Sequence, residues 1–383
     1  MAINVVTFSA SGGAGNVAHT LVEGFSRIGL EANLLTAVDK NLWATPFKAP
    51  ALTAAAMLDE YVLKSRTFDA MVSIARDNYS ALSDQLPLGE LNIFRWMNGL
   101  LGERFLRQNP DLGKLVWGLD DMNPFTGGCH YSGPCDGFES SCNKCPAVRP
   151  LLRAHVGKNL KRKEDFIKIH RPTFVAPTAW MQAEFERAGL AHGEKPLKIL
   201  NPLPTRFFES KPLINRTSTH LKVIIIATNL DDRTKGVWNI KDTLNESLDR
   251  GNFELTLIGR HSQKLLKSLA RANFLGSLDP QSVMEVLTTH DLLLVPSLFE
   301  NAGTVVAEAA SQGIPSLARD VGGMAEMTNY EKSGYLFRNE TELADIIGSV
   351  TKAELQNKGV FAREWAQKLK PELVAKEYAE AFL

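Results

Sequence analysis

The chain has 383 residues, more than one hydrophobic core usually organises, so its length predicts two domains. Hydrophobic residues make up 44% and charged residues 22%, a composition that excludes the disordered and fibrous classes. Lys and Arg together number 43, as do Asp and Glu, so overall charge does not predict a nucleic-acid partner. We expect a cytoplasmic protein, because no apolar run is long enough to span a membrane and none resembles a signal peptide.

The chain opens with a buried strand, Ile3–Phe8, followed by the glycine-rich turn Ser9–Gly15 and a helix that ends near Ile28. This order of strand, glycine turn and helix brings backbone N–H groups to a phosphate. Gly12 and Gly13 are therefore candidate phosphate-binding residues.

A dinucleotide-binding fold is an alternative interpretation of the same turn. Gly13, Gly15 and Ala18 fit the pattern G-x-G-x-x-A. That fold needs an acidic residue at the end of the second strand to hold a ribose. The predicted strand Ala32–Thr36 ends without one, and Asp39 comes late.

Short strands and helical segments then alternate, which predicts a parallel α/β sheet. In the first half these strands are Leu91–Phe94, Leu115–Trp117 and Thr173–Pro177, and a long helix covers Pro146–Arg171. Thr178 is the expected N-cap of the next helix. The polar and proline-rich segment Pro202–Thr219 reads as an interdomain linker, and a second alternation follows. Its predicted strands are Lys222–Thr228, Glu254–Ile258, Phe274–Gly276, Leu292–Val295 and Gly334–Phe337.

The stretch Ser297–Gly323 carries two carboxylates eight positions apart, Glu300 and Glu308. Glu300 lies in a loop after a strand, and Glu308 lies inside a helix expected from about Thr304, with Gly313 as a left-handed C-cap. Such strand–loop–helix junctions collect ligands in α/β domains. The helix N-terminus offers N–H groups and a positive dipole to a phosphate.

This stretch, with its downstream glycines, resembles the E-x7-E signature of retaining glycosyltransferases of family 4. Leu119–Ser132 resembles a subgroup of that family with the sequence LHDMWPFTGGCHYS, associated with exopolysaccharide, colanic-acid and O-antigen assembly. The resemblance implies a GT-B fold with two Rossmann-like domains and a cleft between them. It places the acceptor-side domain at residues 1–203, the nucleotide-sugar domain at 204–364 and a helix that packs back on the first domain at 365–383.

The resemblance also implies an activity. The enzyme would move a hexose-type sugar from a UDP or GDP sugar to a glycan or lipid-linked saccharide in surface polysaccharide synthesis, with retention and without a catalytic metal. Glu300 would hold hydroxyls of the donor sugar, Glu308 would hold the ribose and Lys235 would bind the diphosphate. Asn229 stands where many members have Arg, so Arg233 would supply that charge. The complete donor-binding set is Gly12, Gly13, Asn229, Arg233, Lys235, Gly259, Asn301, Ala302, Gly303, Thr304, Val305 and Glu308.

Two positions depart from the subgroup. Asp120 replaces a His that touches the donor sugar in the family, and Asn123 replaces a Trp. An ionised Asp accepts hydrogen bonds but donates none. We expect Asp120 to line the sugar subsite and to act with Glu300 in catalysis. Two competing functions remain open: a sugar- or nucleotide-binding protein with weakened catalysis, suggested by Asp120 and Asn229, and a dinucleotide-dependent oxidoreductase.

The chain concentrates its cysteines in one polar loop, with the spacing C-x5-C-x6-C-x2-C. Four thiolates suit tetrahedral zinc, and a bound metal would order such a loop. The sequence therefore predicts a structural zinc site, with two disulfides or free thiols as alternatives. Four sulfur ligands leave no open position for catalysis. The four ligands would be Cys129, Cys135, Cys142 and Cys145.

The predicted helix Pro146–Arg171 is basic. This run could meet an anionic membrane surface, which would place the enzyme at the inner membrane, or a lipid-pyrophosphate acceptor. A solvated helix face is the simpler interpretation. Its basic residues are Arg153, Lys158, Lys161, Arg162, Lys163, Lys168 and Arg171.

Overall fold

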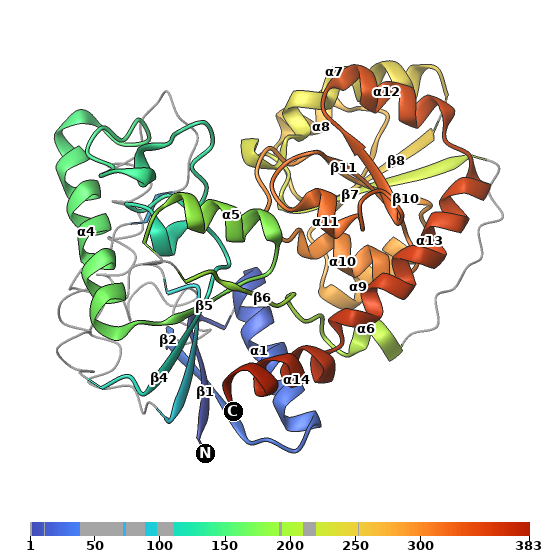
Figure 1. Ribbon diagram of the computed structural model, residues 1–383. Coiled ribbons are helices and arrows are strands. Elements are labelled where there is room, and N and C mark those ends of the chain that lie inside the picture. Colours follow the sequence, from blue (N-terminus) through green and yellow to red (C-terminus); the bar gives the residue numbers. More distant parts are fainter. Residues whose placement is uncertain are drawn as a thin grey trace. The chain divides into compact units, whose positions relative to one another are not determined.

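The computed structural model divides the chain into two compact units. The first unit comprises Met1–Pro202 and Pro371–Leu383, and the second comprises Leu203–Lys370. Each unit contains a six-stranded sheet flanked by helices (Figure 1). Asp39 and part of the expected linker lie outside the described residues. The structure describes residues 2–10, 12–38, 72–73, 89–97, 111–190, 194–209, 220–251 and 253–383.

The sheet of the first unit is parallel throughout its described strands, in the order β2-β1-β3-β4-β5-β6. β1 and β3 are buried along their whole length, as expected of continuous apolar strands covered on both faces. The strands are β1 (Ile3–Ser9), β2 (Ala32–Val38), β3 (Leu91–Arg95), β4 (Lys114–Gly118), β5 (Thr173–Ala176) and β6 (Leu197–Lys198). The helices described in this unit are α1 (Gly12–Arg27), α4 (Arg153–His170), α5 (Ala179–Arg187) and α14 (Pro371–Phe382).

The sheet of the second unit is also parallel, in the order β12-β11-β10-β7-β8-β9. This is the doubly wound Rossmann order, and the direction of winding reverses between β7 and β10. The strands are β7 (Leu221–Asn229), β8 (Phe253–Arg260), β9 (Asn273–Gly276), β10 (Leu292–Val295), β11 (Ser316–Arg319) and β12 (Gly334–Phe337). The helices are α6 (Arg206–Glu209), α7 (Val237–Asp249), α8 (Gln263–Ser268), α9 (Pro280–Thr288), α10 (Thr304–Ser311), α11 (Met324–Met327), α12 (Glu340–Ser349) and α13 (Lys352–Ala366).

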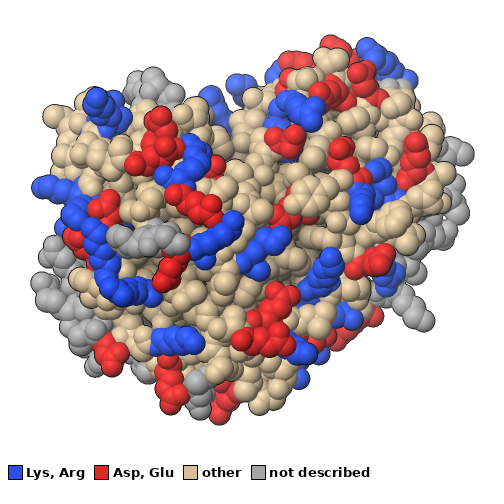
Figure 2. Space-filling view, viewed as in Figure 1, with Lys and Arg blue, Asp and Glu red and all other residues tan. Residues whose placement is uncertain are grey.

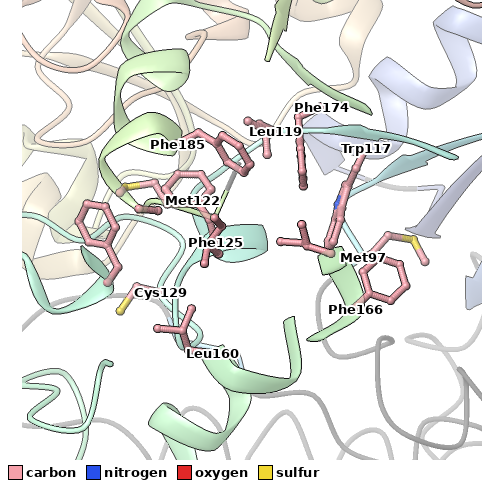
Figure 3. Packing of buried hydrophobic residues seen from close by; sticks show 14 of the residues in the cluster. Met97, Trp117, Leu119, Met122, Phe125, Cys129, Leu160, Phe166, Phe174 and Phe185 are labelled. Carbon is pink, nitrogen blue, oxygen red and sulfur yellow. The ribbon is translucent and has the colours of Figure 1, made fainter. Parts of the chain in front are cut away.

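An aromatic cluster fills the first unit between its sheet and the helices α4 and α5 (Figure 3). Trp117 of β4 stacks on Phe174 of β5, with ring centroids 5.9 Å apart, and meets Phe166 of α4 edge-on at 5.4 Å. Phe185 of α5 packs against the other side of Phe174 at 4.2 Å. Each of these rings contributes about 1.5–3 kcal/mol through burial, so α4 is fixed to the sheet by its apolar face.

The C-terminal helix α14 packs on α1, and both belong to the first unit (Figure 1). Gly24 of α1 allows this approach, because a Cβ there would lie 2.2 Å from the carbonyl oxygen of Pro371. Tyr378 and Phe382 are buried in the core of this unit, whereas Trp365 lies on α13 in the second unit. The return of the last helix to the first domain, expected from the resemblance, is therefore confirmed for α14.

The helix predicted at Pro146–Arg171 begins later, at Arg153, after a short 3-10 turn at Pro150–Leu152. Backbone N–H groups of Ala147 and Val148 bond to the sulfur of Cys145, which holds the preceding residues in the cysteine loop. At its other end the helix terminates as expected, with Arg171 in a left-handed conformation.

Candidate functional site

The candidate site lies at the carboxyl ends of β7 and β10, where the winding of the second sheet reverses. Ligands of doubly wound sheets bind at this point. The loops after the two strands are joined directly, since Leu298 N–H donates to the carbonyl of Thr234 at 2.7 Å. Gly236 has a φ of 71°, and a Cβ there would lie 1.9 Å from the carbonyl oxygen of Pro296. Only glycine permits this contact, which sets the two loops side by side.

The contact between the loops brings the two most important predicted residues together. Lys235, at the end of the 3-10 turn Arg233–Lys235, has its Nζ 2.7 Å from Oε1 of Glu300. The hydroxyl of Ser297 donates to the same oxygen at 3.2 Å. The lysine side chain is 36% exposed and the glutamate 14%. The structure therefore pairs the predicted phosphate-binding cation with the predicted sugar-binding carboxylate.

The helix α10 begins beside this pair, as the sequence predicted. Its N-terminal N–H groups, at Thr304 and Val305, have no acceptor within the helix. Gly303 precedes them, and a Cβ there would lie 2.6 Å from the side chain of Met324, so the residue is held close to α11. The helix ends in the expected glycine motif: Ile314 N–H bonds to the carbonyl of Ala309.

Glu308 lies in the second turn of α10. Burial raises the pKa of its carboxyl to about 7, and the positive charge of Arg206 on α6 opposes this rise. Near neutral pH this carboxyl therefore exists in both protonation states, and it can donate as well as accept a hydrogen bond. Both forms suit a hydroxyl ligand.

Three further residues predicted to bind the donor substrate lie on β7, on β8 and in the turn after β7. Asn229 ends β7, and its side-chain oxygen accepts a hydrogen bond from Asp231 N–H at 3.2 Å. Arg233 is exposed. Gly259 has a φ of 143°, and a Cβ there would lie 1.9 Å from the carbonyl oxygen of Ala227. Strand packing alone therefore requires glycine at position 259.

Gly12 and Gly13 begin α1 in the first unit, at the carboxyl end of β1. Among the residues that the structure describes, none has an atom within 4 Å of a Cβ built at either position, so the backbone there has room for a ligand. Gly15 differs, because a Cβ there would lie 2.6 Å from the carbonyl oxygen of Ser9. The three glycines of this turn thus divide between an open helix start and close packing.

Asp120 follows β4 in the first unit and is bound to a buried arginine. Arg95 donates through Nε to Oδ2 of Asp120 at 3.1 Å and through Nη2 to Oδ1. The two side chains are 2% and 9% exposed. Arg95 also donates to the hydroxyl of Tyr378 at 3.2 Å and to the side-chain oxygen of Asn201 at 2.7 Å. At the position where the resembled family has a His, this chain has the counter-ion of a buried arginine.

This network contains residues that sequence reasoning missed, Arg95 above all. Burial raises the pKa of the Asp120 carboxyl, and the charge of Arg95 opposes that rise. The sequence feature that could have revealed this network is a single charged residue at the end of the apolar strand Leu91–Arg95. The strand buries its arginine almost completely. A buried charge needs a partner, and the acidic residues after the neighbouring strand supply it.

A second missed network is built on Asp121. Its Oδ2 lies 2.6 Å from Nδ1 of His130, and Nε2 of His130 lies 2.9 Å from the hydroxyl of Ser73. The indole of Trp96 donates to the same carboxylate oxygen at 3.1 Å. Trp96 has a φ of 40°, a strained conformation for a bulky side chain. These bonds fix the strained residue beside the motif that resembles the family.

The cysteine loop holds four free thiols. A hydrogen bond from Cys129 lowers the pKa of Cys145 to about 6, whereas burial raises that of Cys142 to about 11. In the described part of the chain, no group of three or more His, Cys, Asp or Glu side chains is placed to hold a metal ion. The four sulfurs as they stand thus do not form a zinc site, and zinc stays a prediction from the sequence.

Hydrogen bonds from α4 hold the cysteine loop and the turn before it. Lys163 donates to the carbonyls of Asn123 and Thr126, Asn159 donates to Gly127, and Arg153 donates to Cys145. Lys163 is buried, and burial lowers its pKa to about 8. The prediction that Lys163 is one of the exposed basic residues of this helix is therefore wrong.

Acidic and basic side chains are intermingled over the face drawn in Figure 2, in keeping with the equal totals of the two charges. A search of the described residues finds no helix that is long and apolar enough to cross a membrane.

Comparison with known proteins finds similarity to glycosyl transferases. Residues 221–352, which hold both Lys235 and the two glutamates, match the family described as Glycosyl transferases group 1. The chain is 24% identical over 296 residues to the putative colanic acid biosynthesis glycosyl transferase WcaC of Escherichia coli, covering 73% of this chain and 70% of that protein.

Two solved structures share the fold along the whole chain. HepE from Anabaena, in complex with UDP-glucose, superposes with a TM-score of 0.65 at 16% identity, covering 100% of this chain and 99% of HepE. Sucrose-phosphate synthase from Thermosynechococcus elongatus superposes with a TM-score of 0.63 at 16% identity, covering 100% and 98%. The fold is the two-domain α/β arrangement of GT-B proteins. Together with the matched segment in the second unit, it makes this chain a glycosyltransferase enzyme.

Proposed function

We propose that the enzyme transfers a hexose-type sugar, with retention, from a UDP-sugar to a glycan or lipid-linked saccharide in surface polysaccharide synthesis. The observation that carries the proposal is the meeting of Lys235, Glu300 and the start of α10 where the second sheet reverses. The similarity to a colanic acid glycosyl transferase supports a polysaccharide product, and the fold shared with a protein solved with UDP-glucose supports uridine over guanosine.

In this proposal the diphosphate binds Lys235 and the first N–H groups of α10. Negative charge grows on the leaving phosphate as the sugar departs. Hydrogen-bond donors and cations that are already in place bind this charge more strongly in the transition state than in the ground state, which lowers the activation barrier. Lys235 is a mobile point charge and suits a phosphate oxygen whose position changes during the reaction. The lysine and the helix dipole take the role that a divalent ion has in other transferases.

The two glutamates bind the remaining parts of the donor substrate, the ribose and the transferred sugar. Glu308, half-protonated near pH 7, accepts from or donates to the ribose hydroxyls. Glu300 accepts from hydroxyls of the sugar. Retention then requires that the acceptor hydroxyl approach on the face that the phosphate leaves.

We assign Asp120 a positioning role, in place of the catalytic role expected from its place in the motif. Arg95 and Trp96 N–H bind its two oxygens, so the carboxylate is committed to protein partners. This assignment also weakens the case for an inactive binding protein, because a lost His at this position need not remove the machinery in the second unit.

Two finer assignments follow the sequence. The exposed lysines of α4, Lys158, Lys161 and Lys168, offer contact with an anionic membrane surface, and sedimentation with vesicles containing phosphatidylglycerol tests it.

A structural zinc ion would require the four thiols to close on one point. One equivalent of zinc released on denaturation would support the ion, and four titrating thiols without zinc would exclude it.

The decisive experiment is a thermal-shift screen of nucleotide sugars, followed by measurement of UDP release with an acceptor glycan. We expect a UDP-sugar to stabilise the protein and Lys235→Ala to abolish that shift. Lys332→Ala, which removes an exposed lysine elsewhere in the second unit, is the matched control. Stabilisation by NAD alone would instead favour an oxidoreductase.

A further inference from the structure

We propose that Glu300 is an internal counter-ion that competes with the bound diphosphate for Lys235 and thereby speeds release of the nucleotide product. The inference rests on the proposed function and adds a second role for one residue of that site. Its starting point is the contact of 2.7 Å between Lys235 Nζ and Glu300 Oε1.

The pair is held by the backbone around it. Leu298 N–H bonds to Thr234, and Gly236 packs on Pro296, so the two loops cannot separate without losing both contacts. On the other side, Gly322 has a φ of 57°, and a Cβ there would lie 1.7 Å from the carbonyl oxygen of Glu300. Gly323 N–H donates to that same carbonyl at 3.2 Å. These contacts fix the backbone of Glu300, from which its carboxylate reaches Lys235.

The two charges differ in their freedom. The lysine side chain is 36% exposed and can turn toward a ligand, whereas the glutamate is 14% exposed and also accepts from Ser297. A diphosphate that binds Lys235 must share the ammonium with Glu300 or take it away. In either case a carboxylate and a phosphate of the same sign come close, which weakens binding.

The intact donor can offset this repulsion, but the product cannot. A donor sugar supplies hydroxyl groups that donate to Glu300 and satisfy its oxygens when Lys235 leaves. After transfer the sugar is gone, and the carboxylate faces the diphosphate with the Ser297 hydroxyl but without the hydroxyl groups of the sugar. Glu300 then draws Lys235 back, and the product loses its main cation. The Lys235–Glu300 pair thus favours binding of the intact donor over binding of the nucleotide product.

The test is isothermal titration of UDP into the wild-type protein and the Glu300→Gln variant. Glutamine keeps the shape and removes the charge. We expect UDP to bind the variant about two- to fivefold more tightly, since an ion pair this exposed is worth no more than about 1 kcal/mol, which corresponds to about fivefold in affinity. The inhibition constant of UDP against turnover should fall by a similar factor, while turnover itself also falls.

Two further variants separate charge from structural damage. Glu300→Asp keeps the charge and withdraws it by one methylene, so its UDP affinity should lie between those of the wild type and Glu300→Gln. Glu285→Gln removes an exposed carboxylate on α9 and should leave UDP affinity unchanged. Thermal unfolding confirms that each variant folds.

Equal or weaker UDP binding by Glu300→Gln overturns the inference while the proposed function stands. If neither the wild type nor the variant binds any nucleoside diphosphate, the proposed function fails and the inference fails with it.

Discussion

Two ion pairs at the ends of parallel strands show how similar chemistry is used differently in the two units. In the first unit, Arg95 and Asp120 are almost fully buried and bound by several neighbours, including Tyr378 and Asn201. In the second, Lys235 and Glu300 meet at the carboxyl ends of the central strands β7 and β10, with the lysine 36% exposed. A ligand cannot replace Asp120 as the partner of Arg95, because that arginine is buried and has many partners. A ligand can replace Glu300 as the partner of Lys235, because that lysine is partly exposed. The comparison separates a buried pair with several partners from a more exposed pair whose lysine we propose binds the diphosphate.

The largest expected effect is on the stability of the first unit. Replacing Arg95 by Ala leaves the Asp120 carboxylate buried without its cation, and we expect the free energy of unfolding to fall by about 3–5 kcal/mol. Urea denaturation measures the change. Arg338→Ala, which breaks an exposed pair with Asp320, is the control and should change stability by less than about 1 kcal/mol. A loss as small as the control's would remove the contrast between the two pairs.

The next effect is on activity and concerns the second unit. Lys235→Ala should lower turnover by about 10²–10³-fold, the usual loss when one donor to a developing charge is removed. Unfolding in urea should be nearly unchanged, because this pair is half-exposed. Steady-state kinetics with a UDP-sugar donor test the prediction. Full activity in this variant would mean that Lys235 is as structural as Arg95.

A pH effect of intermediate size is expected from Glu308. Burial raises its folded pKa from 4.5 to about 7, so the folded protein holds a proton that the unfolded chain has released. The resulting contribution to stability therefore falls as pH rises from about 4.5 to 7, by at most about 3 kcal/mol. Glu308→Gln removes the titrating group, so its unfolding free energy should lack this decline. Parallel pH profiles for both proteins would refute the assignment.

The smallest expected effect is on the free energy of unfolding and concerns the buried network around Arg95. Tyr378→Phe removes the hydroxyl that accepts a bond from Arg95 at 3.2 Å, and it should cost about 1 kcal/mol, the usual value for one hydrogen bond. The substitution lies on α14, so it reports whether the network anchors that helix. Phe382→Leu, a change in apolar packing on the same helix, serves for comparison. An unchanged unfolding curve for Tyr378→Phe would show that the hydroxyl contributes nothing.

The sequence predicted the parallel α/β class and most strand positions, because buried parallel strands read as short apolar runs between turn signals. It also placed Glu300 in a loop and Glu308 in a helix that ends at Gly313. These features are local, so nearby residues determine them. The Leu119–Ser132 motif likewise marked the segment that holds the second missed network.

Other features depend on partners far apart in the chain, and the sequence could not supply them. Arg95 binds residues 25, 106 and 283 positions away. The burial of Lys163 depends on carbonyl groups of a loop some forty residues earlier. The late start of α4 depends on hydrogen bonds to a cysteine sulfur. In each case a polar group is buried, and its partner is known only once the fold is known.

The most direct test of the account is a crystal structure of the enzyme with UDP bound. The account predicts a phosphate oxygen within hydrogen-bonding distance of Lys235 Nζ and of the first N–H groups of α10, with the ribose beside Glu308. A UDP molecule bound away from the junction of β7 and β10, with Lys235 still on Glu300, would contradict it.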